Sequence, residues 1–302
     1  MSVTALVFPG QGSHFVGMGH DLHEAGGPAR AVFEQADAVL GFSLTSLMFE
    51  GPDDELTATQ NQQPAILTHS AACLALLDGK GIEPAFVAGH SLGEYSALLA
   101  AGCLSFGAAL RLVRRRGELM AAAGGGAMAA VLGPAAQEIE EVCAAAREVG
   151  FVGIANLNCP GQTVITGEPA AVEEASRRLK EGGAKRIVPL RVSGAFHSRL
   201  MQPAAEELRQ ALAAASFVDA RVPLVSNTDG LARTGAEDIR QALALQMTMP
   251  VLWDLSVRRM AAEAVARFIE VGPGKVVGGL IRRIVPDVET LAAGTVDEIA
   301  AL

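Results

Sequence analysis

The sequence predicts an α/β fold in which a large domain, built on a parallel sheet, carries a smaller inserted domain. Short apolar segments alternate with longer helix-like segments near both ends of the chain, as is typical of a parallel sheet with helices on its faces. Between these regions a run of three glycines at 124–126 marks a boundary, after which the order of strands and helices changes. With 302 residues, the chain is long enough for two domains.

The first part of the large domain is expected over residues 1–123. Pro64 is placed at the start of a helix, because a proline at the first helical position loses no hydrogen bond. The short apolar segment AFVAG reads as a buried strand, and an alanine-rich helix follows it. The expected elements are a strand over 5–8, a helix over 64–77, a strand over 85–89 and helices over 92–101 and 105–122.

The small domain is expected over residues 124–191, in the order βαββαβ that defines the ferredoxin-like arrangement. Its elements are a strand over 128–132, a helix over 135–149, strands over 152–155 and 163–166, a helix over 168–181 and a strand over 186–190. The large domain then resumes over residues 192–302, with helices over 203–215 and 236–245 and strands over 221–225 and 267–271.

The bulk composition excludes several classes of protein. Half of the residues are hydrophobic and 19% are charged, which argues against disorder. The net charge of −9 gives no support for nucleic-acid binding. The N-terminus has no basic region before its apolar run, and the charge-free stretch over 95–110 is too short for a membrane span. The four cysteines show no metal-binding spacing, so we expect free thiols, no metal and a cytoplasmic location.

The stretch VAGHSLGE places Ser91 between Gly89 and Gly93, where a short strand meets a helix. This is the G-x-S-x-G elbow of hydrolase-like sheets, which presents a serine oxygen at the edge of the sheet and at a helix N-terminus. The alternative is an ordinary serine cap in a glycine-rich turn. Because both glycines and both flanking elements are present, we interpret Ser91 as a nucleophile.

A serine nucleophile needs a base, and the chain offers six histidines. His197 follows a strand, in the small-residue loop SGAFHS, where α/β folds carry their chemistry. His90 is adjacent to Ser91 but points elsewhere across the turn, and His69 lies in an apolar helix as a core residue. His20 and His23 read as solvated helix positions. No acidic residue follows a strand of the first domain, so either the histidine is oriented without a carboxylate or the protein is not a hydrolase.

Arg116 occupies an unusual place in its predicted helix. At 100° per residue it falls in the middle of the apolar face, whereas Arg111, Arg114 and Arg115 point to a solvated face. A guanidinium in an apolar stripe is costly unless an anion meets it. The partner is either a carboxylate within the fold or an anionic substrate.

Six motifs, in this order along nearly the whole chain, together resemble one family, the malonyl-CoA:acyl carrier protein transacylases. The motifs are FPGQGS, TQNQQPA, GHSLGEYSAL, RRRGELM, SGAFHS and FIEVGPGKV. The resemblance implies that Ser91 receives a malonyl group from coenzyme A and passes it to the phosphopantetheine thiol of an acyl carrier protein. It implies His197 as the base, and no cofactor beyond the coenzyme A thioester, which is a substrate.

The resemblance also implies roles around this pair. The backbone carbonyl of Gln246 would orient His197, which would account for the missing carboxylate, and Asn227 would support the site. The backbone N–H groups of Gln11 and Leu92 would form the oxyanion hole. Arg116 would grip the free carboxylate of malonate, with Gln63 in the pocket, and Phe196 would exclude an α-methyl group.

The sequence departs from the family pattern in places that do not touch this pair. Gln62 stands where threonine is expected, and MTMPVLW replaces a version with smaller residues after Gln246. These departures leave open whether the enzyme serves fatty acid synthesis or a polyketide assembly line. The motifs also allow a serine esterase or thioesterase, or a catalytically silent docking module. Because an acidic carrier needs a local basic surface, we expect docking at Arg177, Lys180, Lys185 and Arg186.

Overall fold

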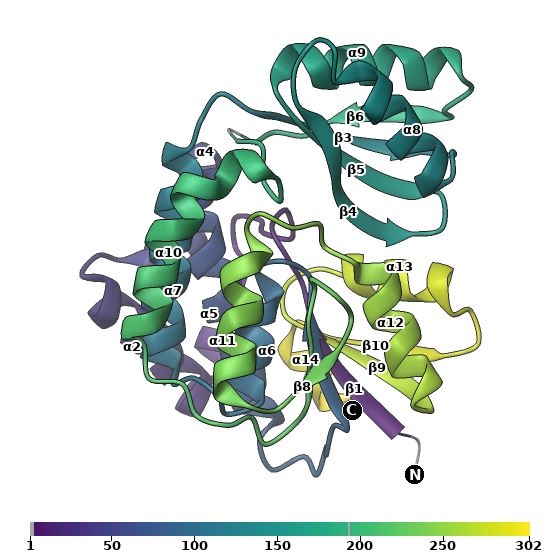
Figure 1. Ribbon diagram of the computed structural model, residues 1–302. Helices are drawn as coiled ribbons and strands as arrows, with labels where there is room; N and C mark the ends of the chain where they lie inside the picture. The colour runs from purple at the N-terminus through teal and green to yellow at the C-terminus, as the bar shows by residue number, and fades with distance from the viewer. Residues whose placement is uncertain (1–2, 193) are drawn as a thin grey trace.

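The computed structural model, which describes residues 3–192 and 194–302, contains two sheets that belong to two domains (Figure 1). The larger sheet has six strands, and the smaller one has four. In chain order the small sheet is built as βαββαβ between two portions of the large domain. The predicted fold class, a hydrolase-like parallel sheet with a ferredoxin-like insert, is therefore confirmed.

The large sheet is parallel except at one edge. Strand β1 lies in its middle, and its side chains alternate between two cores: Leu6 and Phe8 face one, and Ala5 and Val7 face the other. Burial on both faces explains why residues 5–8 of this strand form an uninterrupted apolar run. In spatial order the strands are β10 (Glu289–Ala293), β9 (Val265–Val271), β1 (Val3–Phe8), β2 (Phe86–Gly89), β7 (Leu224–Val225) and β8 (Ala232–Arg233), with only β8 antiparallel to its neighbour.

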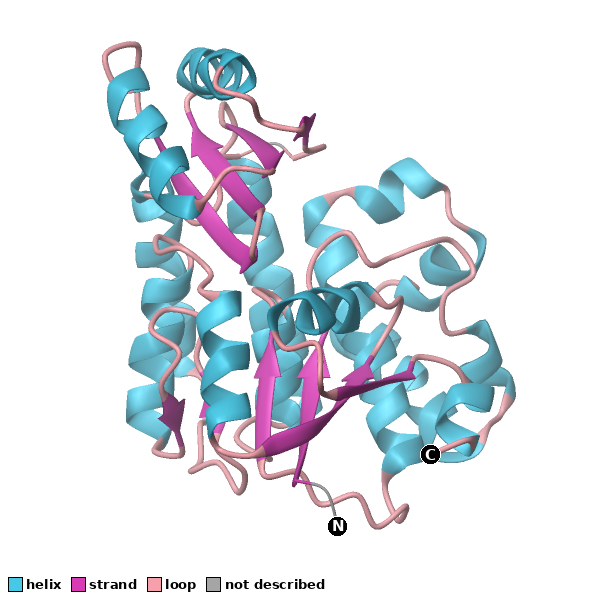
Figure 2. Cartoon of the chain, turned by 90° about the vertical axis from the view of Figure 1, so that its right-hand side faces the viewer, coloured by secondary structure: helices cyan, strands magenta, loops and turns pink. Residues whose placement is uncertain are grey.

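Helices cover both faces of this sheet, as Figure 2 shows. Those that precede the small domain are α1 (His20–Glu24), α2 (Gly27–Leu40), α3 (Leu44–Glu50), α4 (Asp53–Thr57), α5 (Thr59–Leu77), α6 (Gly93–Ala100) and α7 (Phe106–Ala122). Those that follow it are the short 3₁₀ helix η1 (Arg199–Met201), α10 (Gln202–Ala214), α11 (Ala236–Gln246), α12 (Trp253–Ala262), α13 (Val276–Ile284) and α14 (Val296–Ala300). None of the helices described combines the length and hydropathy of a bilayer-spanning segment.

The small sheet is antiparallel, in the spatial order β4-β5-β3-β6, and packs against two helices around a core of its own. Its elements are β3 (Ala127–Leu132), α8 (Ala136–Ala146), β4 (Val152–Cys159), β5 (Gln162–Gly167), α9 (Pro169–Glu181) and β6 (Arg186–Pro189). Strand β4 continues four residues beyond the predicted end, because its last residues pair with β5 and with Val251 of the large domain.

The two crossings between the domains lie against each other. A Cβ at Gly126, on the way into the small domain, would lie 2.0 Å from the backbone nitrogen of Ala195 on the way out. The glycine run therefore supplies a residue without a side chain at this close approach, in addition to a boundary.

The predicted start of the helix at Pro64 is wrong. Helix α5 begins at Thr59, so Pro64 lies inside it. A proline there leaves the carbonyl of Gln60 without its helical donor. The guanidinium of Arg114 replaces that donor with a bond of 2.9 Å from Nη1 to the Gln60 oxygen. Arg114 is therefore not simply a solvated residue, as the sequence analysis expected, and it stabilises the helix across the proline.

Candidate active site

Ser91 lies in the sharp turn between β2 and α6, with a backbone φ of 51°. The left-handed conformation is unusual for a residue other than glycine and is characteristic of strained functional turns. A Cβ at Gly89 would lie 1.9 Å from the carbonyl carbon of Gly93, and one at Gly93 would lie 2.3 Å from the Phe8 oxygen. Both glycines are therefore required by the close approach of backbone segments, which is the geometry of a nucleophile elbow.

His197 lies beside Ser91, although 106 residues separate them in the chain. Its Nε2 is 2.8 Å from the Ser91 Oγ, and its Nδ1 is 2.9 Å from the backbone oxygen of Gln246. Because a carbonyl only accepts hydrogen bonds, Nδ1 carries the ring proton and Nε2 is free to accept the serine proton. Burial, reinforced by the charge of Arg116, lowers the pKa of His197 to about 3, so the ring is neutral at physiological pH.

The other candidate histidines point away from Ser91. His90 Nε2 lies 2.8 Å from the Asn158 Oδ1 of strand β4, and its ring contacts Trp253 edge-on. His69 is buried, and its Nδ1 lies 3.5 Å from the Cys73 Sγ. Burial lowers the pKa of His69 to about 4, as expected of a neutral core histidine. The prediction that His23 is solvated is wrong in part, because its half-buried ring packs edge-on against two phenylalanine rings.

Arg116 projects from α7 towards Ser91 and His197, the candidate catalytic dyad, and its side chain is 1% exposed. Its Nη1 donates to the Gln63 Oε1 at 2.8 Å, and its Nη2 donates to the Ser91 Oγ and the Gln246 Oε1, each at 3.0 Å. Its Nε has no partner within the described residues. All these acceptors are neutral oxygens, and among residues 3–192 and 194–302 no carboxylate forms an ion pair with Arg116. The direct internal ion pair that the sequence left open is therefore not observed.

Two side-chain amides hold the elbow. The Asn227 Oδ1 accepts from the Ser91 backbone N–H at 2.7 Å, and its Nδ2 donates to the Gly89 carbonyl at 2.7 Å. The side chain of Gln246 donates from Nε2 to the Ser91 carbonyl at 2.9 Å and also to the carboxylate of Glu94. Only the backbone carbonyl of Gln246 was expected to contribute to the site, whereas its side chain also connects Ser91, Arg116 and Glu94.

The two N–H groups expected to form an oxyanion hole lie at the start of α6 and in the turn after β1. In the part of the chain that the structure describes, the N–H groups of Leu92 and Gln11 have no hydrogen-bond acceptor. The neighbouring Gly12 N–H donates to the Gln62 Oε1 at 2.9 Å, so Gln62, noted above as a departure, holds the turn that contains Gln11. This connection was not predicted.

Phe196 is 3% exposed, and its ring lies against Gly194, where a Cβ would approach the ring carbon Cε1 to 2.7 Å. Its role as a wall of the acyl pocket stays a prediction. Ser193, the first residue of the SGAFHS motif, lies outside the described residues. All four cysteines are buried and free.

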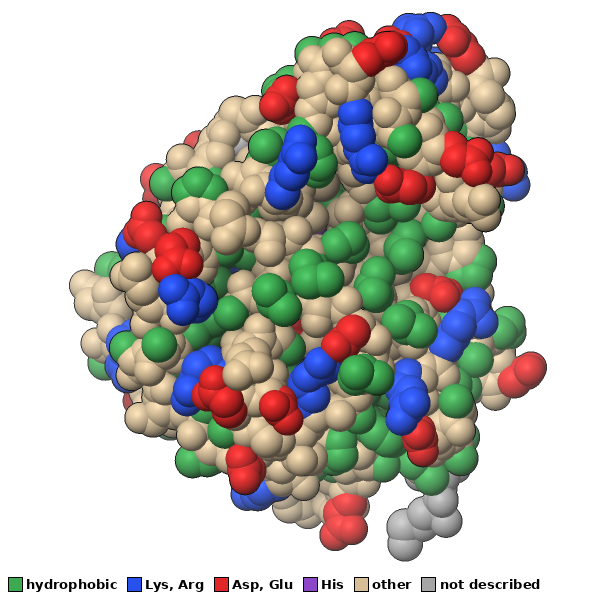
Figure 3. Space-filling model, viewed as in Figure 1, with side chains coloured by type: hydrophobic (Ala, Val, Ile, Leu, Met, Phe, Trp, Pro, Cys, Tyr) green, Lys and Arg blue, Asp and Glu red, His purple; other side chains and the backbone are tan. Residues whose placement is uncertain are grey.

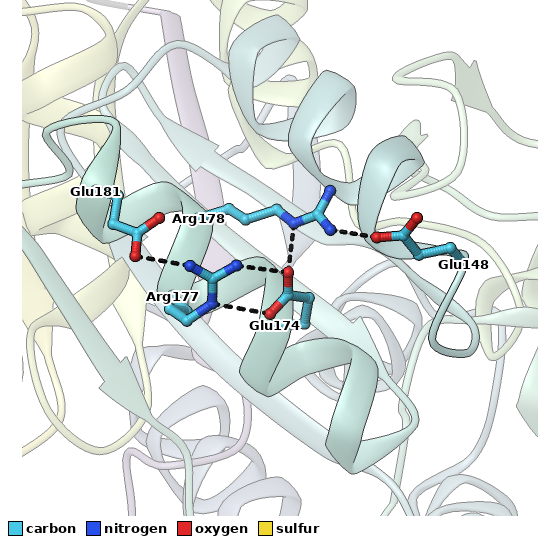
Figure 4. A network of polar contacts seen from close by, with 5 residues as sticks. All are labelled: Glu148, Glu174, Arg177, Arg178 and Glu181. Atoms are coloured by element: carbon cyan, nitrogen blue, oxygen red, sulfur yellow. Dashed lines mark hydrogen bonds and ion pairs between the residues drawn. The ribbon is translucent and has the colours of Figure 1, made fainter.

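The basic surface expected on the small domain is only partly available. Arg177 contacts Glu174 and Glu181, and Arg178 contacts Glu174 and Glu148, as Figure 4 shows. Both arginines therefore have counter-ions already. Lys180, Lys185 and Arg186 are exposed and take part in no ion pair with any described residue.

Residues 5–293 match a family model described as the acyl transferase domain. The chain belongs to this family. The malonyl CoA-acyl carrier protein transacylase of Bacillus subtilis (strain 168) is 49% identical to it, covering 99% of this chain and 96% of the relative. The enzyme of the same name from Staphylococcus aureus (strain MRSA252) is 41% identical, covering 99% of this chain and 98% of the relative.

Solved structures agree with this assignment. An acyl-carrier-protein S-malonyltransferase from Bartonella henselae superimposes with a TM-score of 0.97 at 44% identity, covering 99% of this chain and 98% of the other. A malonyl-transacylase solved in complex with the holo acyl-carrier protein of a type II polyketide synthase gives a TM-score of 0.96 at 41% identity, again over 99% and 98% of the two chains. The malonyl transacylase architecture thus extends over nearly the whole chain.

Proposed function

We propose that this protein is an acyltransferase that moves a malonyl group from malonyl-CoA to the phosphopantetheine thiol of an acyl carrier protein, supplying extender units for fatty acid synthesis. One observation carries the proposal. A buried guanidinium with no direct counter-ion among the described residues lies 3.0 Å from the oxygen of a serine that is itself 2.8 Å from a neutral histidine. Such a site accepts an acyl group that ends in a carboxylate.

The first half-reaction loads Ser91. Its Oγ attacks the thioester carbonyl while His197 Nε2 takes the hydroxyl proton, and the N–H groups of Leu92 and Gln11 stabilise the negative oxygen that develops. The carbon–sulfur bond then breaks, and His197 returns the proton to the departing coenzyme A thiol. The product is a malonyl ester on Ser91.

The second half-reaction reverses these steps with another thiol. The carrier's phosphopantetheine gives its proton to His197 and attacks the ester carbonyl, after which Ser91 recovers the proton. Gln246 holds His197 through its backbone carbonyl throughout, and Asn227 holds the turn of Ser91. The reaction needs no cofactor other than its thioester substrate.

Arg116 would bind the malonyl carboxylate with two N–H groups, in place of some of its present bonds to neutral oxygens. Gln63 keeps the guanidinium oriented through Nη1. Holding the far end of the acyl group places the thioester carbonyl over Ser91. Phe196 is proposed as the wall that limits the α-carbon, and we expect the enzyme to act in the cytoplasm.

A free-standing malonyl transferase of a polyketide synthase is the second candidate function. It is favoured by the 41% identity to the malonyl-transacylase solved with a polyketide carrier protein. Hydrophobic side chains gather between the two domains on the face shown in Figure 3. This surface does not distinguish a fatty-acid carrier from a polyketide carrier, because both present the same phosphopantetheine arm.

The proposed function is tested by incubating the protein with malonyl-CoA and measuring its intact mass. We expect a malonyl adduct that maps to Ser91, transfers to an added holo carrier protein and is missing in Ser91→Ala. Rapid release of free malonate would instead show a thioesterase, and a wild type without any adduct would show a silent docking module. Comparing kcat/KM for a fatty-acid and a polyketide carrier protein distinguishes the two pathways.

A further inference from the structure

Glu94 is a fully buried carboxylate in the first turn of α6, three residues after Ser91. Its Oε2 accepts from the Nε2 of Gln246, and its Oε1 accepts from the backbone N–H of Asn227 at 3.4 Å. Within the described residues no cation pairs with it directly. A buried charge satisfied only by neutral donors is costly, so its retention calls for a reason beyond helix formation.

Both residues that bind Glu94 also bind the nucleophile turn. Asn227 holds the Ser91 N–H with its side chain, and Gln246 holds the Ser91 carbonyl with its side chain. The two backbone polar groups of Ser91, a residue in a strained conformation, are thus held by the side chains of Asn227 and Gln246. Glu94 accepts from both residues, from Gln246 through its side chain and from Asn227 through its backbone N–H. The structure contains a closed polar network in which Glu94 is the common acceptor.

Three neighbours of the Gln246 amide agree on which way it points. Arg116 only donates, so it faces Oε1, and the Ser91 carbonyl only accepts, so it faces the NH₂ group, which also donates to Glu94. The main-chain carbonyl of the same residue holds His197 Nδ1. Gln246 therefore connects the nucleophile side and the base side of the dyad, and Glu94 holds its NH₂ group from within the core.

We propose that Glu94 is a positioning residue that aligns Ser91 and His197 by orienting Gln246 and Asn227. The carboxylate that the hydrolase pattern places directly behind the histidine here lies behind the serine turn, and it acts through the side chain of Gln246 and the backbone of Asn227. The inference rests on the proposed function only for its dyad, because alignment of the serine and histidine is independent of which acyl group is carried.

Glu94→Gln is the substitution that tests this role. Whichever way the new amide turns, its NH₂ group faces either the NH₂ of Gln246 or the N–H of Asn227, so one of the two bonds is lost. The matched control is Glu270→Gln, since Glu270 is also a buried carboxylate that accepts two N–H groups, those of Val277 and Gly278, at the start of α13. Glu94→Asp keeps the charge but shortens the reach.

The readout is the rate at which Ser91 reacts with phenylmethylsulfonyl fluoride, followed by intact mass. In this reaction the serine oxygen bonds to sulfur, fluoride leaves, and the serine proton passes to His197, so the rate reports the dyad without any acyl-group selection. We expect Glu94→Gln to react about 10- to 100-fold more slowly than wild type, the range for a lost hydrogen bond to a charged group. Glu94→Asp should lose less, and Glu270→Gln should react as wild type does.

Malonyl-CoA kinetics give the second measurement. We expect kcat to fall in Glu94→Gln with KM nearly unchanged, and acetyl loading to fall by the same factor as malonyl loading. Thermal unfolding of each variant verifies that it is folded. A folded Glu94→Gln with wild-type sulfonylation overturns the proposal. If that variant does not fold, wild-type sulfonylation in Glu94→Asp overturns it, because the position of the carboxylate would then be irrelevant.

The two proposals fail in different ways. A wild type that is sulfonylated at Ser91 but forms no malonyl adduct would contradict malonyl transfer and leave the role of Glu94 standing. A wild type that loads malonate, with a Glu94→Gln variant that loads it equally fast, would contradict only the role of Glu94. A wild type that is not sulfonylated at all would contradict the dyad and, with it, the positioning role.

Discussion

Charge is arranged in opposite ways in the two domains. On the small domain the arginines of α9 lie at the surface and meet glutamates directly (Figure 4). In the large domain Arg116 and Glu94 are buried, and each meets only neutral amides and hydroxyls among the described residues. Exposed pairs contribute little because water already solvates each partner. A buried cation that lacks a counter-ion instead marks the place where an anionic ligand would bind.

The largest effect on activity is expected when the buried cation, Arg116, is removed. We expect Arg116→Ala to lower kcat/KM for malonyl-CoA on the order of 10²- to 10³-fold, since it deletes a buried partner of the malonyl carboxylate. Acetyl-CoA has no carboxylate, so its loading should fall far less. Arg116→Lys should recover part of the loss, because a lysine keeps the charge but not the two-pronged geometry.

The control for Arg116 is its neighbour Arg115, which is exposed and paired with Glu118 and Glu207. Arg115→Ala should leave the ratio of malonyl to acetyl loading unchanged. If Arg116→Ala lowers both loadings equally, Arg116 has a structural role only, and the account of acyl selection given above is wrong.

A smaller effect is expected at the wall of the same site. Phe196→Ser should admit methylmalonyl-CoA better, because one methyl group excluded by a pocket changes selectivity by roughly 10- to 200-fold. Phe196→Leu, which keeps most of the bulk, serves as the control. The measurement is the ratio of kcat/KM for malonyl-CoA and methylmalonyl-CoA, and an unchanged ratio in both variants would place the wall elsewhere.

Acid should affect the two domains at different pH values. The pKa of His197 is lowered to about 3 by burial, so between 6.5 and 3 the unfolded chain binds a proton that the folded chain does not. The stability linked to His197 is complete above 6.5 and is lost as the pH falls. The pKa of Glu174 is lowered to about 2 by its arginine partners, so its contribution is complete above 4.5 and is lost only below that value.

Urea unfolding at a series of pH values tests this order. The difference in unfolding free energy between wild type and His197→Ala should fall by up to about 1.4 kcal/mol per pH unit as the pH decreases below 6.5. The difference between wild type and Glu174→Gln should stay constant until about pH 4.5. Parallel curves for wild type and His197→Ala would mean that His197 has an ordinary pKa.

The smallest effect is expected on the surface of the small domain. Replacing Lys185 and Arg186 together by glutamate should raise KM for the carrier protein by about 2- to 5-fold and leave malonyl-CoA kinetics alone. Arg177→Ala should change KM less, because its charge is already matched by Glu174 and Glu181. Equal effects on both substrates would indicate damaged folding instead of lost docking.

The features of this molecule that depend on local geometry could be predicted from the sequence. The glycines around Ser91 are dictated by backbone contacts within one turn, and the inward face of Arg116 follows from helical periodicity. Both features can be recognised from residues that lie close together in the sequence. His197 was expected in a loop after a strand, but that strand, β6, belongs to the small sheet, so the histidine meets Ser91 because the chain crosses back to the large domain and not because the two strands end at one edge.

Contacts between distant segments were not predictable in this way. Pro64 reads as a helix start, and only the side chain of Arg114, far along the chain in α7, allows the helix to begin before it. Glu94 reads as an ordinary acidic residue in a first helical turn, and its burial becomes evident only when α11 and the loop after β7 pack over it. No spacing in the sequence records those partners.

The pairing of strand β4 with the large domain predicts how the small domain would behave as an isolated fragment. The outer edge of β4 is not open: the Val251 N–H donates to the Ala155 carbonyl at 2.8 Å, and the Leu157 N–H donates to the Val251 carbonyl at 2.9 Å. The opposite edge, β6, is short and carries Arg186 and Pro189, which discourage pairing with another chain. An excised 124–191 fragment would keep that guarded edge but expose β4 as a bare template. Self-association, leading to fibrils or precipitate, is the expected fate of the fragment, and the large domain acts as the permanent cover that prevents it.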